Sequence, residues 1–253
     1  PHEFTIFREG FATYRTLITP RKGIEKRYNI RLKTEEFAKR EAEQKRQKDN
    51  REGYITTFSG QEMKLFNGGK ITLGTKENLK GRRANEVVRD VILETPFYFS
   101  TKEVTNSQFR EFLGNHDSGQ FGGESLNEAD QPVASVSWFE SVLYCNWLSR
   151  RDGLEKFYLI KYGELFGINT EANGYRLPTE AEWEFLSRPK SKEPPSIFPW
   201  GSEYPPPQKT GNFADKSSSN RMVEKLKDYD DSFAVASPVG SFQKSMNDLY
   251  DMG

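Results

Sequence analysis

The chain has 253 residues, and its 37 basic and 37 acidic side chains give a formal net charge of zero. This balance gives no reason to expect nucleic acid or an anionic membrane as the main partner, and no apolar run approaches the ~20 residues of a membrane-spanning helix. The single cysteine, Cys145, excludes an internal disulfide. The two histidines, His2 and His116, lie far apart in the sequence, and no His/Cys cluster has the ligand spacing of a zinc or non-haem iron site. A metal would therefore have to be held by oxygen atoms.

The N-terminal residues 2–33 alternate apolar and polar side chains over short stretches. Phe4 and Ile6 form one such set, Tyr14 and Ile18 belong to a second, and residues 25–32 contain a third. This pattern predicts β-strands. A segment with so few strands is too small to bury a core of its own, so we expect the end of a small β-module.

Residues 33–52 contain many strong helix formers and almost no apolar side chain. The apolar heptad positions of a coiled coil are missing, so the segment is predicted to be a solvated, charged, helical linker. Acidic residues are mixed among the basic ones, which argues against a nucleic-acid-binding arm.

From Tyr54 onward the pattern changes to short strands with turns, at residues 63–75 and 89–104. Three helix starts follow, each a Ser or Thr with Glu or Gln three residues later, which is the spacing of a capping box. The pairs are Thr105 with Gln108, Ser137 with Glu140, and Thr179 with Glu182. Gly114 or Asn115 and Gly153 are the predicted stops of the first two helices.

The third start places Glu180, Glu182 and Glu184 around Trp183. Paired carboxylates can divide general acid and general base work, so an active site is one interpretation. The alternative is a helix N-terminus, where Glu182 caps and Glu180 interacts favourably with the helix dipole. We favour the helix start, with Trp183 packed beside the apolar residues Ala181, Phe185 and Leu186.

The second helix has a mainly apolar face, which predicts that Cys145 lies beside a packed surface as a small buried hydrophobe rather than a reactive thiol. The residues that share this helical spacing are Phe139, Val142, Leu143, Asn146 and Trp147.

Beyond Arg188 the chain is rich in proline, glycine and serine, with few periodic apolar residues. A loop of this length inside a compact domain needs a reason, such as a bound ion, a functional surface or disorder. Asp228, Asp230 and Asp231 then gather just before an apolar segment at 233–239, which is predicted to be a strand.

Six segments, in this order, resemble the formylglycine-generating enzyme family, also called the sulfatase-modifying factor family. They read GGKITLGT, PFYFSTKEVTNSQFREF, QPVASVSWFESVLYCNWLSRRDG, GYRLPTEAEWEFLSR, FPWG and SPVGSF…LYDMG. The resemblance covers about residues 60–253, and the run Tyr175 to Glu184 is highly specific. The N-terminal segment resembles, over a much shorter stretch, the end of a PEGA domain, a small β-module often found in bacterial envelope proteins.

This resemblance implies a variant of the C-type lectin fold. It also implies that the segment YRLPTEAEWE is a conformational signature and not a catalytic centre. The family's oxidases use two cysteines and a copper ion after a segment like GNVWEW, which would follow residue 253. Cys145 matches the family's structural cysteine, so no catalytic residue is carried over. Many relatives keep the fold without the cysteine pair, so the fold alone does not give the activity.

The resemblance further implies structural calcium. Asn212 and the carbonyl of Phe213 match ligands in one loop, and Asp231 with the carbonyl of Phe233 match ligands in another. Hard oxygen ligands from loops are what calcium takes. A second family site would begin at Asp251, with its other ligands beyond residue 253. The alternative that the aspartates of the second loop only cap a turn stays open.

We therefore predict an α+β fold of the formylglycine-generating-enzyme type with little regular secondary structure. The expected organisation is the end of a PEGA-like β-module at 1–33, a charged helical linker at 34–53 and the family domain at 54–253, truncated at its C-terminus. The expected function is a non-catalytic binding or structural module in a bacterial envelope or periplasmic protein, with a protein, peptide or glycan ligand. The alternative is a formylglycine-generating oxidase whose catalytic cysteines lie beyond residue 253. No signal peptide is visible after Pro1, so a targeting segment is expected outside this sequence.

Overall fold

The structure is a computed structural model of the whole chain, and it divides into two compact units, residues 1–55 and 56–253. The residues that it describes are 53–75, 82–188, 197–218, 222, 225–252 and, nearer the N-terminus, 2–6, 8–9, 11, 14–18, 32 and 34. Each unit is described by itself. None of the helices in the described part of the chain is long and apolar enough to cross a membrane.

The first unit contains an antiparallel pair of strands, β1 (His2–Ile6) and β2 (Tyr14–Ile18), with Phe4 opposite Thr16. The two stretches of alternating residues at the start of the chain are therefore strands, as predicted. The strand predicted at 25–32 and the predicted helical linker fall almost entirely outside the described residues.

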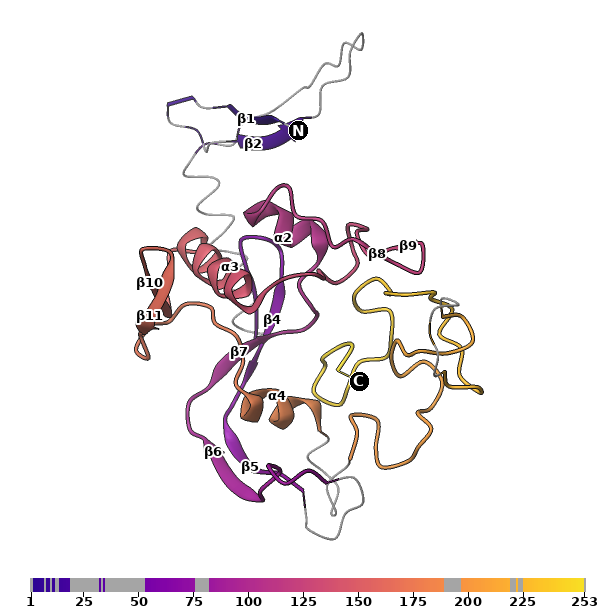
Figure 1. The fold of residues 1–253 in the computed structure, drawn as a ribbon. Coiled ribbons are helices and arrows are strands. Elements are labelled where there is room, and N and C mark those ends of the chain that lie inside the picture. Colours follow the sequence, from indigo (N-terminus) through magenta and orange to yellow (C-terminus); the bar gives the residue numbers. More distant parts are fainter. Residues whose placement is uncertain are drawn as a thin grey trace. The chain divides into compact units, whose positions relative to one another are not determined.

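Small antiparallel sheets form the first part of the second unit (Figure 1). β4 pairs with β7 and has β3 on its other side, while β5 and β6 form a separate two-stranded sheet. The bounds are β3 Tyr54–Thr56, β4 Glu62–Phe66, β5 Gly69–Leu73, β6 Arg89–Leu93 and β7 Phe97–Ser100. The strands predicted at 63–75 and 89–104 are confirmed.

The three helices begin at the three predicted capping boxes. They are α2 (Asn106–Phe112), α3 (Trp138–Arg151) and α4 (Glu180–Ser187). In each box the Ser or Thr side chain accepts the third helical N–H, and the Glu or Gln side chain accepts the N–H of the cap residue. Gly114 and Gly153 each follow the C-cap residue of α2 and α3, so the predicted stops are confirmed, and Gly153 has a φ of 71°, a left-handed conformation that favours glycine.

The segment just before α4 is fixed to α3 by hydrogen bonds. Tyr175 donates its N–H to the Ser149 hydroxyl (2.8 Å) and its own hydroxyl hydrogen to Asp152 (2.8 Å). Gly174 passes so close to this helix end that a Cβ there would lie 1.9 Å from the carbonyl oxygen of Glu155. The signature segment is thus a conformational device that joins two helices, and only glycine fits at its first position.

One core cluster lies under α4, where Phe185 and Leu186 pack with Phe66 and Leu249. The prediction for Trp183 is wrong, because it is 46% exposed. Position 183 lies nearly opposite Phe185 around the helix, at the edge of the buried face, so the tryptophan is partly exposed to solvent.

A second cluster joins α2 to α3 through Phe109, Tyr144 and Leu148, whose rings and side chains are almost fully buried. On α3 the buried residues are Val142, Tyr144, Cys145, Asn146, Leu148 and Ser149. The predicted face is right for Val142 and Asn146, and Trp147 of that face packs against the second cluster. Tyr144 and Leu148 are buried as well, because they pack with Phe109 of α2.

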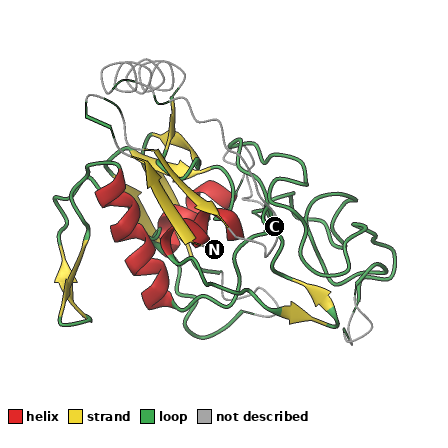
Figure 2. Ribbon diagram, turned by 90° about the horizontal axis from the view of Figure 1, so that it is seen from above, coloured by secondary structure: helices red, strands yellow, loops and turns green. Residues whose placement is uncertain are grey.

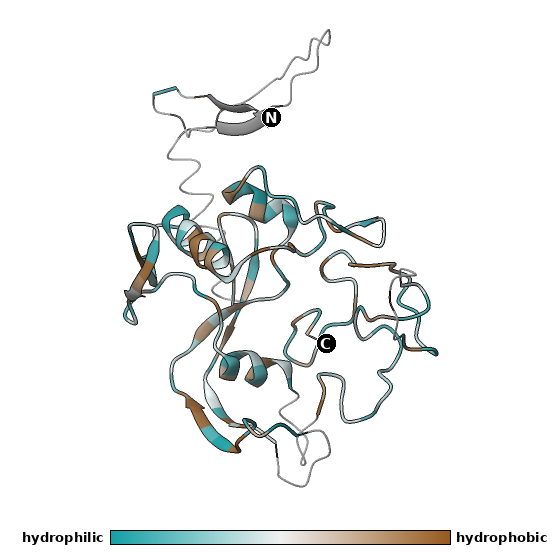
Figure 3. Cartoon of the chain, in the orientation of Figure 1, coloured by the Kyte–Doolittle hydropathy of each residue, from teal (hydrophilic) through white to brown (hydrophobic). Residues whose placement is uncertain are grey.

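Two hairpins were not predicted. β8 (Gln120–Phe121) pairs with β9 (Glu124–Ser125), and β10 (Tyr158–Lys161) pairs with β11 (Glu164–Ile168). Figure 3 shows strongly hydrophobic residues on the β10–β11 hairpin, which packs on α3 through the buried ring of Tyr158.

The described residues beyond α4 form loops with neither helix nor strand (Figure 2). The long loop predicted after Arg188 is confirmed for its described part, residues 197–218. The strand predicted at 233–239 is wrong. Phe233 and Val235 are half-buried in these loops, so this apolar segment contributes to packing without pairing in a sheet. The α+β fold class with little regular secondary structure is confirmed.

Candidate functional site

The three glutamates around Trp183 do not share a site, because each one pairs with a different arginine. The pairs are Arg89–Glu180 (3.3 Å), Arg176–Glu182 (2.5 Å) and Arg188–Glu184 (2.7 Å). Carboxylates that share a proton or a substrate would have to converge on one point. The structural interpretation of this stretch is correct.

Glu182 is the buried member of the three, with 6% of its surface exposed. One carboxylate oxygen accepts the N–H of Thr179 (2.8 Å) and an N–H of Arg176 (2.8 Å). Burial acts to raise the pKa of the Glu182 carboxyl, but the hydrogen bonds from Arg176 and Thr179 outweigh it, and the pKa lies below its usual value. A carboxylate that stays ionised and paired in this way caps a helix rather than transferring protons.

Cys145 is a free, buried cysteine on α3. Burial raises the pKa of its thiol to about 12, so the thiolate is scarce at neutral pH. The prediction of a small buried hydrophobe is confirmed, and this thiol is not a nucleophile.

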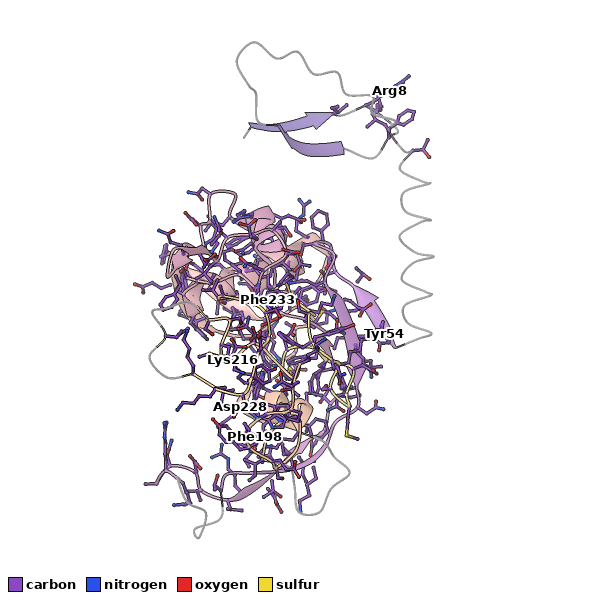
Figure 4. All side chains as sticks on the ribbon, turned by 90° about the vertical axis from the view of Figure 1, so that its right-hand side faces the viewer. Arg8, Tyr54, Phe198, Lys216, Asp228 and Phe233 are labelled. Atoms are coloured by element: carbon purple, nitrogen blue, oxygen red, sulfur yellow. The ribbon has the colours of Figure 1, made fainter. Side chains whose placement is uncertain are left out.

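Four of the five predicted calcium ligands lie together in the loops that follow α4, residues 197–218 and 225–252, which we call the C-terminal loops. Figure 4 labels Phe233 among their side chains. One Asp231 oxygen accepts the N–H of Phe213 (2.9 Å) and the other accepts the N–H of Phe233 (2.8 Å). The Asn212 amide nitrogen donates to the carbonyl of Val235 (2.7 Å). Asp231 therefore ties the two loops together, as either a capping residue or a metal ligand would.

Asp215 is a second buried carboxylate in this cluster, and it was not predicted. It is fully buried and accepts the N–H groups of Asp231 (2.5 Å) and Ser217 (2.8 Å). Burial acts to raise the pKa of Asp215, but these hydrogen bonds outweigh it and lower the pKa. An aspartate followed two residues later by serine is a common turn signal and could have identified it.

The oxygen atoms of this cluster are of the kind that calcium prefers. The hydroxyl of Ser217 lies within 3.0 Å of Asp215, Asp231 and the carbonyl of Phe233, so one hydroxyl faces three oxygen atoms. Within the described ranges no three His, Cys, Asp or Glu side chains group to hold a metal ion, so a calcium ion here would depend on main-chain carbonyls. The residues fit such a site.

Asp251, the fifth predicted ligand, lies elsewhere, beside Glu103. One of its oxygens accepts the N–H of Gly240 (2.5 Å), and the other is buried without a hydrogen-bond donor among the described residues. Glu103 and Asp251 lie within hydrogen-bonding reach of each other. Glu103 was not predicted, and its position just before a helix cap carries no local signal for this pairing.

These two carboxyl groups line a cavity of about 400 Å³ with largely apolar walls. The other lining residues are Phe121, Leu126, Pro132, Gly211, Asn212, Met222, Val235, Ala236, Ser237 and Phe242. Although Glu103 as a residue is exposed, removal of its carboxyl from water and the neighbouring Asp251 raise the pKa of Glu103 to about 7. Burial likewise raises the pKa of Asp251.

Comparison with curated proteins finds relatives of different kinds. Chaperone protein LppX of Paenibacillus barcinonensis is 36% identical over 105 residues, which cover 36% of this chain and 35% of that protein. Inactive C-alpha-formylglycine-generating enzyme 2 of Bos taurus is 29% identical over 208 residues, 73% of this chain and 65% of the relative. Formylglycine-generating enzyme of Bos taurus is 26% identical over 207 residues, 73% and 53% of the two. The matches thus span between 35% and 65% of these relatives' lengths.

Among solved structures, PvdO from Pseudomonas aeruginosa has the same fold. The TM-score is 0.54 at 21% sequence identity, and the match covers 79% of this chain and 70% of PvdO. The family described as Sulfatase-modifying factor enzyme 1-like domain matches residues 51–253. The chain therefore belongs to the sulfatase-modifying factor family, whose formylglycine-generating members it resembles in the order of its motifs.

Proposed function

We propose that this chain is a non-catalytic binding or structural module of a bacterial envelope protein. One observation carries the proposal for these 253 residues: their single cysteine is buried in the core, so this part of the family domain offers no thiol for oxidase chemistry. An oxidase of this family would use two cysteines that can reach copper and substrate. Cys145 offers neither a partner thiol nor an accessible thiolate.

The range of relatives supports a role other than oxidation. Two curated relatives of this family carry the name inactive C-alpha-formylglycine-generating enzyme 2, and LppX is named a chaperone. The family fold is therefore used without the oxidase chemistry. The envelope location rests on the PEGA-like resemblance of the first residues, which remains a prediction.

The oxidase alternative is favoured by the match to formylglycine-generating enzyme itself. The test is to incubate the full-length protein that contains this chain with copper and a Cys-x-Pro-x-Arg peptide and to measure aldehyde formation by mass spectrometry. We expect none, while an active formylglycine-generating enzyme in the same buffer converts the peptide. Turnover by the full-length protein would overturn the proposal.

A structural calcium ion in the C-terminal loops is part of the same proposal. Asp231 and the Phe233 carbonyl would supply ligands from one loop, and Asn212 and the Phe213 carbonyl from the other. Bound calcium would supply charge neutralisation for two buried carboxylates, Asp215 and Asp231. These loops lack sheet hydrogen bonds, so a shared ion would give them a fixed conformation.

A further inference from the structure

The cavity between the β8–β9 hairpin and the C-terminal loops has apolar walls, and the polar side-chain groups that it offers to a ligand are hydrogen-bond acceptors. Phe121, Leu126 and Phe242 are among its apolar residues, and its volume of about 400 Å³ is typical of ligand sites. The polar groups are the carboxyls of Glu103 and Asp251 and the amide of Asn212. The amide nitrogen is already used by the carbonyl of Val235, so these three side chains offer the cavity acceptors.

The carboxyl pair makes no salt bridge in the described part of the chain, although the charge of Lys102 is close enough to act on Asp251. None of the ion pairs between described residues includes Glu103 or Asp251. Lys102 is the adjacent lysine, but its ammonium lies over the ring of Tyr250, 5.0 Å from the centroid, and does not line the cavity. One oxygen of Asp251 is buried without a donor. Two carboxyls this close can share one proton, but when both are ionised they repel each other, and a bound cation would relieve this repulsion.

The walls indicate which kind of cation fits. A calcium ion takes six to eight oxygen ligands, and this cavity offers two carboxyls and an amide among apolar side chains. An anion would be repelled, and a neutral apolar ligand would bury the carboxyls without a partner. An alkylammonium or guanidinium group on an aliphatic stem matches both parts, because such a stem packs on apolar surface while its head donates hydrogen bonds.

We propose that this cavity binds a lysine or arginine side chain of a peptide or protein partner, with Glu103 and Asp251 receiving the cationic head and Phe121 and Phe242 enclosing the stem. This assignment rests on the proposed function as a binding module and names the chemistry of its ligand. The aromatic walls would strengthen binding of the cationic side chain, since a cation close to a ring face is attracted by the ring.

The test measures binding of fluorescein-labelled Gly-Gly-X-Gly-Gly peptides by anisotropy, in chelator, with X as lysine, arginine, acetyl-lysine or norleucine. We expect the lysine or the arginine peptide to bind, and acetyl-lysine and norleucine to bind at least about tenfold more weakly, because they lack the charged donor. Binding that is equal for lysine and norleucine, or absent for both cationic peptides, would overturn the proposal.

Variants locate the site. Glu103→Gln and Asp251→Asn are each expected to weaken binding of the cationic peptide by at least about tenfold, and Phe121→Ser to weaken it through the lost stem contact. Glu124→Gln, which changes an exposed carboxylate of β9 outside the cavity, is the matched control and should bind like the parent. Thermal melts establish that each variant is folded. Unchanged binding in Glu103→Gln would place the peptide elsewhere and refute the assignment.

A measurement of calcium binding and the oxidase assay separate the other outcomes. If calcium binds this cavity and no cationic peptide does so in chelator, the site is a metal site and the proposal is wrong. Aldehyde formation would refute the non-catalytic function while leaving any measured peptide binding intact. Failure of peptide binding would leave the non-catalytic function standing.

Discussion

At the scale of single residues, the environment of a side chain and not its identity decides its chemistry. Cys145 and Glu182 are residue types that serve as nucleophile and general base in many enzymes. In this chain Cys145 is buried on the packed face of α3, and Glu182 is paired with Arg176. Glu103 shows the opposite case, since a carboxyl with no local signal acquires a pKa of about 7 from its surroundings.

The thiol of Cys145 should resist alkylation in the folded protein. Its pKa of about 12 leaves little thiolate at pH 8, and its burial excludes the reagent. Iodoacetamide labelling followed by mass spectrometry should give almost no adduct on the native chain and complete labelling in guanidinium. Rapid labelling under native conditions would contradict the buried position.

Glu103 should make stability fall as pH rises. Its pKa is raised from 4.5 to about 7 on folding, so the folded state holds a proton that the unfolded state has lost. The associated stability is fully present below pH 4.5 and is lost as pH rises through about 7. Glu103→Gln cannot ionise and removes this dependence.

The measurement is the melting temperature of parent and Glu103→Gln between pH 5 and pH 8.5, in chelator. The variant's melting temperature relative to the parent's should increase through this range, because only the parent forces two carboxylates together at high pH. Parallel curves would show that the two groups do not interact in solution.

At the scale of elements, each helix begins at a reciprocal capping box, and α4 adds the Arg176–Glu182 pair to its own. Helices of seven and eight residues such as α2 and α4 are marginal on propensity alone, so their ends and buried faces determine whether they form.

Thr179→Ala should destabilise the protein by about 1 kcal/mol, because it removes the acceptor for the N–H of Glu182. Glu182→Ala should cost more, since it also leaves the Arg176 guanidinium without its buried partner. Urea unfolding measures both. Glu180→Ala, at an exposed surface pair, is the control and should change the free energy of unfolding by less than either.

At the scale of the whole molecule, the described residues beyond α4 form loops. Side-chain hydrogen bonds hold these loops, where a β-sheet would use backbone hydrogen bonds between strands. Tyr229 illustrates this, because its buried hydroxyl donates to the Gly211 carbonyl and accepts the N–H of Thr210. A fold built in this way depends on a few buried polar groups, and a bound ion would strengthen it.

If the proposed calcium ion binds, it should raise the free energy of unfolding by about 2.7 kcal/mol at a hundredfold excess over its dissociation constant. A chelator should then lower the melting temperature and open the C-terminal loops to protease. Asp231→Ala should melt like the chelated parent and lose its response to calcium. Superimposed melts with calcium and with chelator would show that these aspartates only cap turns.

The sequence by itself determined the local structure of this protein. A capping box, a strand alternation and a turn depend on side chains a few residues apart, so Thr105, Ser137 and Thr179 marked the helix starts directly. The order of its motifs also identified the family. The apolar residues at 233–239 suggested a strand, and this prediction was wrong. A strand needs a neighbouring strand to pair with, and an apolar pattern in the sequence does not show whether one is present.

Only the tertiary structure decided which distant groups meet. Trp183 is exposed because it lies at the edge of the face that α4 buries. Asp215 joins Asp231 because two loops fold back on each other. Glu103 and Asp251 lie far apart along the chain, and each has an ordinary local context. Their shared cavity and raised pKa values arise from burial and from charge–charge distance, which are properties of the folded chain and have no local pattern in the sequence.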